Sequence, residues 1–298
     1  MKHERVETGR SPDYQDCRYG QSRLAFRGPM VVPDDRTITF IGGAETFGRY
    51  MEVPFPTLVS RKMNRPVVNL GFPNAGPDLL GSDPDLIEIC NRSAAVVFQV
   101  PDALNLSNRL YRVHRRRNDR FIGASGQLRD LFEDVDFSQF TFTRHMLGAV
   151  WEAAPDQFDV LRTEMQTAWR HRMRVLLSRF TVPVILLWLS DKPPRPPHWG
   201  DEGNPLATRP ILVSGEMLKA AGEHASRTIV VVPNAHDIEE GQTDLILPPD
   251  TTDLASGALG TLAHDQAARA VIDTLGKLGI GKKMSLPEGR LIPRKTAV

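Results

Sequence analysis

A glycine-rich turn from Gly42 to Gly48 carries the residues best suited to chemistry. It reads Gly-Gly-Ala-Glu-Thr-Phe-Gly and follows the apolar run 37–41, which is typical of a buried strand. Glu45 could act as a base or a nucleophile, and Thr46 could attack an electrophile if a histidine took its proton. The competing interpretation is structural, because a threonine cap and an acidic residue facing the helix dipole are ordinary at a helix start.

Other polar segments also follow predicted strands. Residues 69–76 read Asn-Leu-Gly-Phe-Pro-Asn-Ala-Gly and end the second strand, and residues 99–108 follow the third. His236 follows the fifth strand, and His264 opens the last predicted helix. For His264 the competing interpretation is a structural hydrogen bond at a helix N-terminus. Since ligands gather at the carboxyl ends of parallel strands, these segments are expected near one site.

The order of these segments resembles that of the SGNH/GDSL-type hydrolases over about residues 37–276. The glycine turn is similar to their G-D-S-L-T-x-G block, and residues 69–76 are similar to N-x-G-x-x-G/A. His264 and the helix that follows it resemble the family's C-terminal D-x-x-H. Ala44 stands where the family has its serine nucleophile, and a methyl group cannot attack a carbonyl carbon.

The resemblance implies a role for each matching residue. His264 would be the base, and Gly71 and Asn105 would be the oxyanion donors, with Asn108 a weaker candidate than Asn105. Thr46 would be the only nucleophile left at the turn, although the family's geometry points the third turn residue into the site and thereby favours the structural interpretation of Thr46 and Glu45. The residues expected to contact the ligand are Gly43, Ala44, Glu45, Asn74 and His236.

The acid partner of the histidine is missing from the matching position. Thr261 stands three residues before His264, where the family has an aspartate, and a hydroxyl can orient an imidazole without stabilising its cation as a carboxylate does. Asp253 or Asp250 in the preceding loop is the alternative partner.

The chain also resembles an uncharacterised bacterial family. The similar stretches are 19–20, 26–29, 45–49, 107–109 and 116–121. That resemblance implies a fold and brings no established activity.

An arginine-rich segment from Arg109 to Arg120 is the second strong feature, with six arginines and one histidine in twelve residues. Guanidinium groups bind carboxylate, phosphate or sulfate in bidentate fashion, which predicts an anionic ligand such as a nucleotide, a CoA thioester or an acidic glycan. Arg116 and Arg120 are the two expected to face the pocket. The alternative is a solvated surface paired with the nearby acidic residues, which the balanced net charge favours for several of the arginines.

Five short apolar segments rich in β-branched residues predict the strands of a parallel sheet, and helical patterns lie between them. We therefore expect a three-layer α/β/α domain over residues 37–280, with an N-terminal arm (1–36), a helical insertion at about 105–180 and a basic tail (281–298). The strand order 2-1-3-4-5 is implied by the SGNH resemblance. The predicted strands are 37–41, 66–70, 94–100, 182–189 and 228–232, and the predicted helices are 54–64, 84–92, 142–180 with a break at 152–156, 214–225 and 264–278.

Composition narrows the function further. The 298 residues carry a net charge of +1, so neither overall basicity nor a known motif indicates nucleic acid. Two distant cysteines suit a reducing cytoplasm, and neither a secretory signal nor an apolar run of ~20 residues is visible. No Walker motif, dinucleotide motif, G-x-S-x-G or zinc spacing is present, so no cofactor and no metal are expected.

Two functions of different class follow. The first is a divergent SGNH-like esterase or O-acyltransferase acting on a polar acylated substrate such as a glycan, through Thr46 or through direct attack by a substrate hydroxyl that His264 activates. The second is a catalytically inactive protein of the same fold that binds an anionic carbohydrate or a nucleotide-like ligand, which Ala44 and Thr261 favour.

Overall fold

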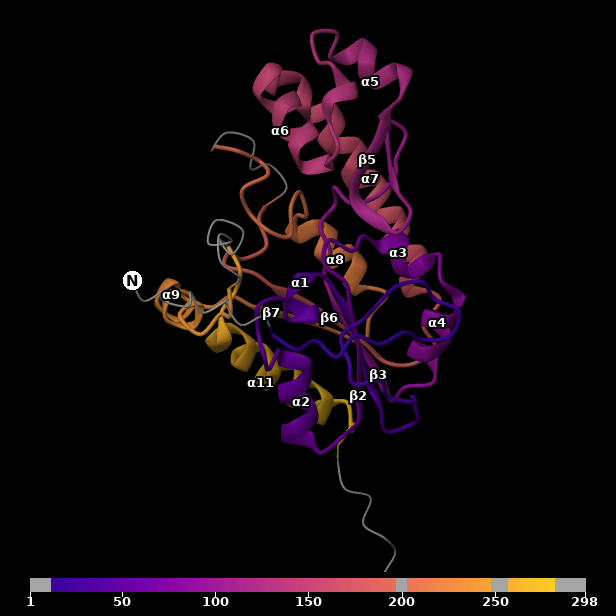
Figure 1. Ribbon diagram of the computed structural model, residues 1–298, viewed down its shortest axis with the longest axis vertical. Helices are drawn as coiled ribbons and strands as arrows, with labels where there is room; N and C mark the ends of the chain where they lie inside the picture. Colours follow the sequence, from indigo (N-terminus) through magenta and orange to yellow (C-terminus); the bar gives the residue numbers. More distant parts are fainter. Residues whose placement is uncertain (1–11, 197–202, 248–256, 282–298) are drawn as a thin grey trace, which may run out of the picture.

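A five-stranded parallel sheet forms the centre of the computed structural model, which describes residues 12–196, 203–247 and 257–281 (Figure 1). The strand order is β2-β1-β3-β6-β7, which confirms the predicted order. The strands lie within two residues of the predicted segments at most ends, and they are β1 (Ile38–Gly42), β2 (Val67–Gly71), β3 (Ala95–Gln99), β6 (Val184–Leu189) and β7 (Arg227–Val231).

Helices cover both faces of this sheet, which makes the fold a three-layer α/β/α sandwich. Alternate side chains of a strand enter two separate cores: Ile41 and Phe98 enter one, while Phe40 and Val97 enter the other. The first core is covered by α3 (Pro77–Gly81), α4 (Pro84–Asn91), α7 (Phe158–Leu177) and α8 (Gly215–Gly222), and the second by α2 (Phe55–Met63) and α11 (Thr261–Lys277). Helix α9 (Ala235–Gln242) packs beside α11.

The insertion after β3 contains an antiparallel hairpin as well as helices. Strands β4 (Tyr111–His114) and β5 (Arg117–Ala124) pair where the sequence predicted a helical insertion, because buried and exposed side chains alternate along β4 with the period of a strand. The remaining elements are α5 (Gly126–Leu131), a 3-10 turn (Phe137–Gln139), α6 (Thr143–Ala153), a second 3-10 turn (Pro155–Gln157) and α7. In Figure 1 the hairpin, α5 and α6 project from one end of the sheet domain.

Helix α7 fastens the insertion to the sheet. Trp169 is fully buried on this helix and donates from its indole Nε1 to the Pro101 carbonyl oxygen at 3.0 Å, just after β3. The apolar residues of α7 therefore pack in the core, as their spacing predicts. The break that the sequence indicated between two helices falls at the second 3-10 turn.

The described part of the N-terminal arm packs on the sheet domain beside the glycine turn. Phe26 is fully buried, and Tyr14 packs against Phe47 with ring centroids 4.9 Å apart. Arg27 donates to the carbonyl oxygens of Gly48 at 2.8 Å and Glu52 at 2.7 Å. The chain after α1 is thus held by the arm as well as by the sheet.

The register of the strands brings their carboxyl ends to one edge. Gly42 at the end of β1 lies opposite Gly71 of β2, and Gln99 at the end of β3 lies opposite Leu187 of β6. Short helix α1 (Ala44–Phe47) leaves β1 at this edge and ends at Gly48, whose φ of 76° is the left-handed conformation that glycine adopts without strain.

Candidate active site at the carboxyl edge of the sheet

A cleft of about 330 Å³ opens at the carboxyl edge of the sheet. This volume lies at the lower end of the about 300–1,000 Å³ that is usual for small-molecule sites. Its walls come from the turn after β1, the ends of β3 and β6, helix α6 and the segment before α11. The polar residues that line it are Glu45, Arg49, Asn74, Gln99, Asp102, Asn105, Arg144, Ser190, Asp191 and Arg209.

A carboxylate and an imidazole meet at this cleft. His264 Nε2 lies 3.0 Å from Glu45 Oε2, and His264 Nδ1 accepts a hydrogen bond from the Phe55 N–H, also at 3.0 Å. Because Nδ1 is an acceptor, the proton of the neutral ring sits on Nε2, and His264 donates it to Glu45. The second carboxylate oxygen of Glu45 faces the Leu259 N–H at 3.4 Å.

The two members of this pair differ in their access to a ligand. His264 is fully buried and is not part of the cleft lining, whereas Glu45 lines the cleft and keeps 19% of its side chain exposed. The imidazole therefore has no free nitrogen for a substrate, and the carboxylate is the member of the pair that a ligand can reach.

Thr46 does not line the cleft. Its side chain is fully buried, and Oγ1 donates to Gln99 Oε1 at 2.6 Å. The same amide oxygen accepts the N–H groups of Gly43 at 3.2 Å and Thr46 at 3.1 Å. The hydroxyl thus helps to hold the turn instead of capping α1, whose N-cap residue is Gly43, which has no side chain. Gly43 and Ala44 line the cleft.

The Gly71 amide is occupied. Its N–H donates to Asn69 Oδ1 at 2.9 Å, and Asn69 Nδ2 donates in turn to the Thr46 carbonyl oxygen at 2.8 Å. A Cβ at position 71 would lie 2.2 Å from the Phe47 backbone nitrogen. The close approach of helix α1 to the end of β2 therefore requires a glycine here, whatever the chemistry of the site.

Asn105 and Asn74 lie together in the cleft wall. Asn105 Nδ2 donates to the Asn74 carbonyl oxygen at 3.1 Å, and Asn105 Oδ1 is buried with no hydrogen-bond partner. The side chain of Asn74 donates to Asp119 at 3.3 Å. The amide group that was expected to meet an oxyanion is thus bonded to the neighbouring loop. Asn108, the weaker candidate, accepts from the backbone N–H groups at the start of β4.

Thr261 and His236, two further candidates from the C-terminal part of the sequence, do not line the cleft. Thr261 Oγ1 donates to Asp244 Oδ2 at 2.9 Å, so it does not orient His264. His236 is exposed on α9 and lies 3.4 Å from Glu240. Asp250 and Asp253 lie outside the described residues.

The cleft is lined by Arg49 just after α1, Arg144 on α6 and Arg209 in the loop before α8, and the predicted arginine segment contributes none. Arg209 Nη1 pairs with Asp102 Oδ2 at 2.5 Å, while Arg144 donates to the Leu206 carbonyl oxygen at 3.2 Å and has no carboxylate partner in the described parts of the chain. Partial burial, and then the neighbouring Arg209 guanidinium, lower the pKa of Arg144, while Asp102 opposes this shift.

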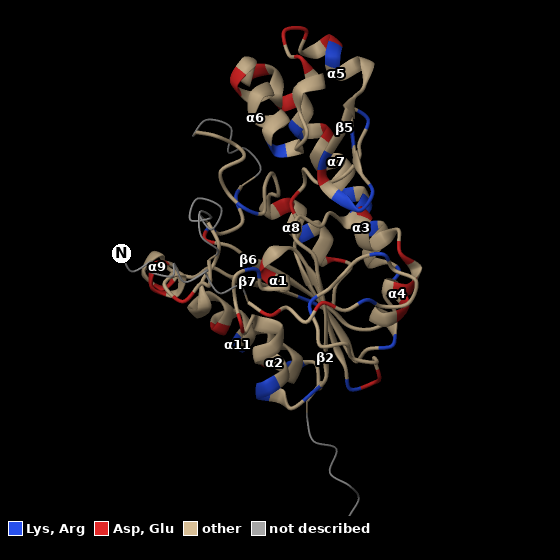
Figure 2. Ribbon diagram, in the orientation of Figure 1, with Lys and Arg blue, Asp and Glu red and all other residues tan. Residues whose placement is uncertain are grey.

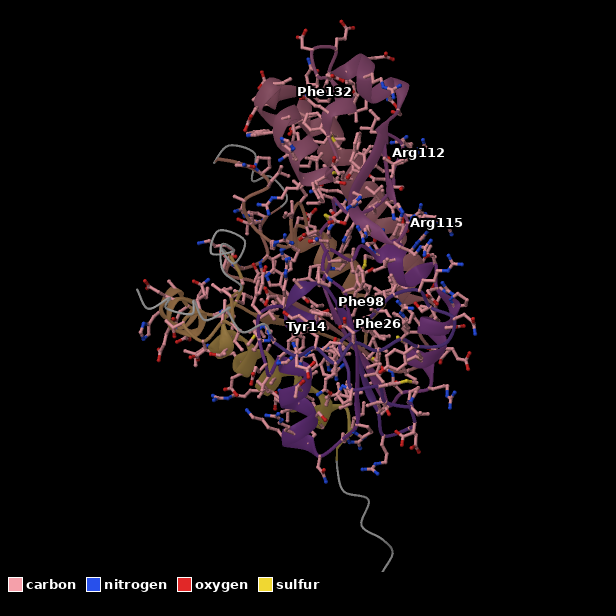
Figure 3. All side chains as sticks on the ribbon, in the orientation of Figure 1. Tyr14, Phe26, Phe98, Arg112, Arg115 and Phe132 are labelled. Carbon is pink, nitrogen blue, oxygen red and sulfur yellow. The ribbon has the colours of Figure 1, made fainter. Side chains whose placement is uncertain are left out.

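The arginine-rich hairpin forms an exposed surface of the insertion. Arg116 and Arg120 are exposed and do not line the cleft. Figure 2 shows the basic residues of this segment on the hairpin side of the insertion, and in Figure 3 the side chains of Arg112 and Arg115 point outward from it. The structure therefore places the exposed arginines of this segment at the surface of the insertion, outside the cleft.

Within residues 12–196, 203–247 and 257–281, no group of three or more His, Cys, Asp or Glu side chains is arranged to hold a metal ion. No helix in the same ranges has the length and apolar character needed to cross a membrane.

The sequence analysis did not predict three cleft residues as site residues, namely Gln99, Arg144 and Arg209. Gln99 ends β3, so its place at the carboxyl end of a strand was a usable signal. Arg144 and Arg209 carry no local signal, because they reach the cleft through the packing of the insertion and of a long loop.

The sheet order, the carboxyl-edge cleft and the short helix after β1 define a three-layer α/β/α protein with the flavodoxin-like strand order 2-1-3-4-5. The chain belongs to the family described as a domain of unknown function, DUF6473, which matches it over residues 1–279. No curated protein sequence matches the chain.

Solved structures with some similarity include carbohydrate esterases. A catalytic mutant of an acetylxylan esterase from Geobacillus stearothermophilus is 14% identical, with 83% of this chain and 97% of that chain covered and a TM-score of 0.40. An acetyl xylan esterase from the rumen bacterium Butyrivibrio proteoclasticus is 13% identical, with 86% and 67% covered and a TM-score of 0.39. At these TM-scores the fold assignment rests on the sheet order and register.

Proposed function

We propose that the protein is an ester hydrolase or O-acyltransferase in which Glu45, oriented by His264, is the general base. The observation that carries this proposal is the hydrogen bond of 3.0 Å between His264 Nε2 and Glu45 Oε2, with the other ring nitrogen held by Phe55. A buried donor that fixes a carboxylate at the wall of a cleft is a common way to position a base. The proposal moves the role of base from His264 to Glu45.

The reaction needs no protein nucleophile. Glu45 takes a proton from a water molecule or from a hydroxyl of the substrate, and the oxygen so activated attacks the acyl carbon. The bond from the acyl carbon to the alcohol oxygen then breaks, and Glu45 returns the proton to the departing alcohol. Water as the attacking group gives a carboxylic acid, and a hydroxyl gives a new ester. Ala44 is compatible with this route because no serine takes part.

The acyl acceptor or donor is proposed to be polar, such as an acylated glycan. Hydrogen-bonding and charged side chains line the cleft on several sides, among them Asn74, Asp191 and Arg209. These groups suit the hydroxyls of a sugar better than they suit a long acyl chain, because each would lose its hydration against an apolar ligand.

The test is hydrolysis of a panel of short acyl esters, including an acetylated sugar, by the purified protein and its Glu45→Gln variant. Glutamine keeps an oxygen to accept from His264 and removes the base, so a loss of about 10²- to 10⁴-fold in kcat/KM is expected. Arg120→Gln on the exposed hairpin is the matched control and should retain wild-type activity. Hydrolysis that survives in Glu45→Gln would sink the proposed role of Glu45.

Thr46→Val separates this route from covalent catalysis. Valine has nearly the shape of threonine and lacks the hydroxyl, which in the wild type is buried against Gln99. We expect this variant to keep more than about a tenth of the activity, because the two backbone N–H groups still hold Gln99. A loss as large as that in Glu45→Gln would favour Thr46 as nucleophile.

A second candidate function is binding of an anionic ligand without turnover. It is favoured by the charges of the cleft, where Asp102 balances Arg209 and Arg144 has no carboxylate partner among the described residues. A guanidinium without a carboxylate partner is suited to a carboxylate or phosphate on the ligand. Calorimetric binding of phosphate by a wild-type protein that turns over none of the esters would favour this candidate over the enzyme.

A further inference from the structure

The side-chain amide of Gln99 has a fixed orientation. Its oxygen accepts three hydrogen bonds, from the N–H groups of Gly43 and Thr46 and from the Thr46 hydroxyl, at 3.2, 3.1 and 2.6 Å. A flipped amide would set its NH₂ group against the two backbone N–H donors, so the oxygen must face the turn. The two N–H donors of Nε2 must then face the opposite way.

These two donors are free and open to the cleft. Nε2 makes no hydrogen bond within the described parts of the chain, and it does not belong to the buried side-chain atoms there that lack a partner. Gln99 lines the cleft together with Ala44 and Glu45. An unengaged donor is therefore held rigidly on the wall that also carries the base.

Each donor predicted from the sequence makes a hydrogen bond within the fold, although Asn105 Nδ2 uses only one of its two N–H groups. The Gly71 N–H is bonded to Asn69, and the Asn105 amide is bonded to the Asn74 carbonyl oxygen. A carbonyl oxygen that becomes negatively charged during attack needs at least one preorganised donor in its place. Gln99 Nε2 meets the requirement, because its orientation is set before any ligand binds.

We propose that Gln99 donates from Nε2 to the acyl carbonyl oxygen of the substrate and stabilises the oxyanion formed during attack. This inference rests on the proposed acyl chemistry. The hydrogen bonds that hold Gly43 and Thr46 in the turn then have a second function, because they also orient the Gln99 side-chain amide. In the reaction the oxyanion forms as the activated oxygen bonds to the acyl carbon, and it collapses when the alcohol departs.

Gln99→Glu tests the donor while keeping the clamp. One carboxylate oxygen can still accept from Gly43 and Thr46, and the other replaces the two N–H donors with an acceptor. We expect kcat for the best ester of the panel to fall about 10²- to 10³-fold, with a smaller change in KM, because the lost interaction forms mainly in the transition state. The thermal midpoint should stay close to that of the wild type.

The pH profile distinguishes a lost donor from a disturbed base. A new carboxylate beside Glu45 could by itself displace the acid limb of the profile, so activity is measured from pH 5 to 9. A fall in kcat at every pH supports the donor. Recovery of wild-type kcat at high pH overturns it, because the variant would then act only by disturbing Glu45.

The outcomes also separate this inference from the proposed function. An active wild type with an inactive Glu45→Gln variant and an active Gln99→Glu variant would leave the base in place and overturn the role of Gln99. A wild type that hydrolyses none of the esters and transfers none of their acyl groups to a sugar hydroxyl would overturn both.

Discussion

Replacing His264 with asparagine or with glutamine tests whether His264 is itself the base or only positions Glu45 as the base. Asparagine places its oxygen near the position of Nδ1, so His264→Asn keeps an acceptor for the Phe55 N–H and loses the donor to Glu45. Glutamine reaches the position of Nε2, so His264→Gln keeps the donor to Glu45 and leaves the Phe55 N–H without an acceptor. Phe55 is fully buried, so water does not reach it in the folded protein.

The two variants should differ in stability in a predictable order. A buried donor left without a partner costs about 1–3 kcal/mol, so His264→Gln should lower the free energy of unfolding by that amount. His264→Asn loses only the bond to Glu45, whose side chain is 19% exposed and can turn toward water. The net value of such a bond is about 0.5–1.5 kcal/mol, which makes His264→Asn the more stable of the two. Urea unfolding followed by circular dichroism measures both values.

Activity should follow the opposite order. His264→Gln still orients Glu45 and should keep at least about a tenth of kcat/KM, which corresponds to a barrier change of at most about 1.4 kcal/mol. His264→Asn leaves Glu45 unoriented and should lose more. If both folded variants lost about 10²- to 10⁴-fold, as much as Glu45→Gln, His264 would itself be the base and the reasoning from its hydrogen bonds would be refuted.

Two further predictions concern stability. Gly71→Ala should lower the free energy of unfolding by about 1–3 kcal/mol or more, because its Cβ would lie 2.2 Å from the Phe47 backbone nitrogen. Gly43→Ala is the matched control, since a Cβ there has nothing within 4 Å. Equal thermal midpoints for the two variants would contradict this prediction. Arg109 hydrogen-bonds Glu164 and lowers the pKa of that carboxyl below its ordinary value of 4.5, so the pair stabilises the fold above about pH 4.5 and loses this contribution as the pH falls further. Because Arg109 is 82% exposed, solvent screening keeps this contribution small. The difference in unfolding free energy between wild type and Glu164→Gln should therefore shrink from pH 7 to pH 3, and a difference that grew would refute the sign.

The outline of the fold could be predicted from the sequence because it depends on local patterns. Five apolar, β-branched segments between helical patterns specify a parallel sheet, and the observed strands lie close to them. The hairpin β4–β5 was missed, since a four-residue strand gives too short an alternation to stand out beside a cluster of arginines. Its pairing depends on contacts with the insertion that only the folded chain forms.

The location of the site could also be predicted from the sequence, but the roles of its residues could not. The glycine turn marks the carboxyl end of β1, and the structure brings Glu45, Asn74 and Asn105 into the cleft that begins there. Whether an amide or an imidazole is free depends on its partner, and those partners lie far away in the chain. Phe55 is more than two hundred residues from His264, and no spacing in the sequence reports their hydrogen bond.

The sequence by itself thus determined the strands, most helices and the edge of the sheet where chemistry is expected, because hydrophobic period and turn composition are properties of neighbouring residues. Only the tertiary structure decided that Glu45 and not His264 faces the cleft, that Gln99 clamps the turn, and that Arg144 and not Arg116 lies in the cleft wall. The physical reason is that burial and hydrogen-bond partners are set by long-range packing, and these decide which polar groups remain available to a ligand.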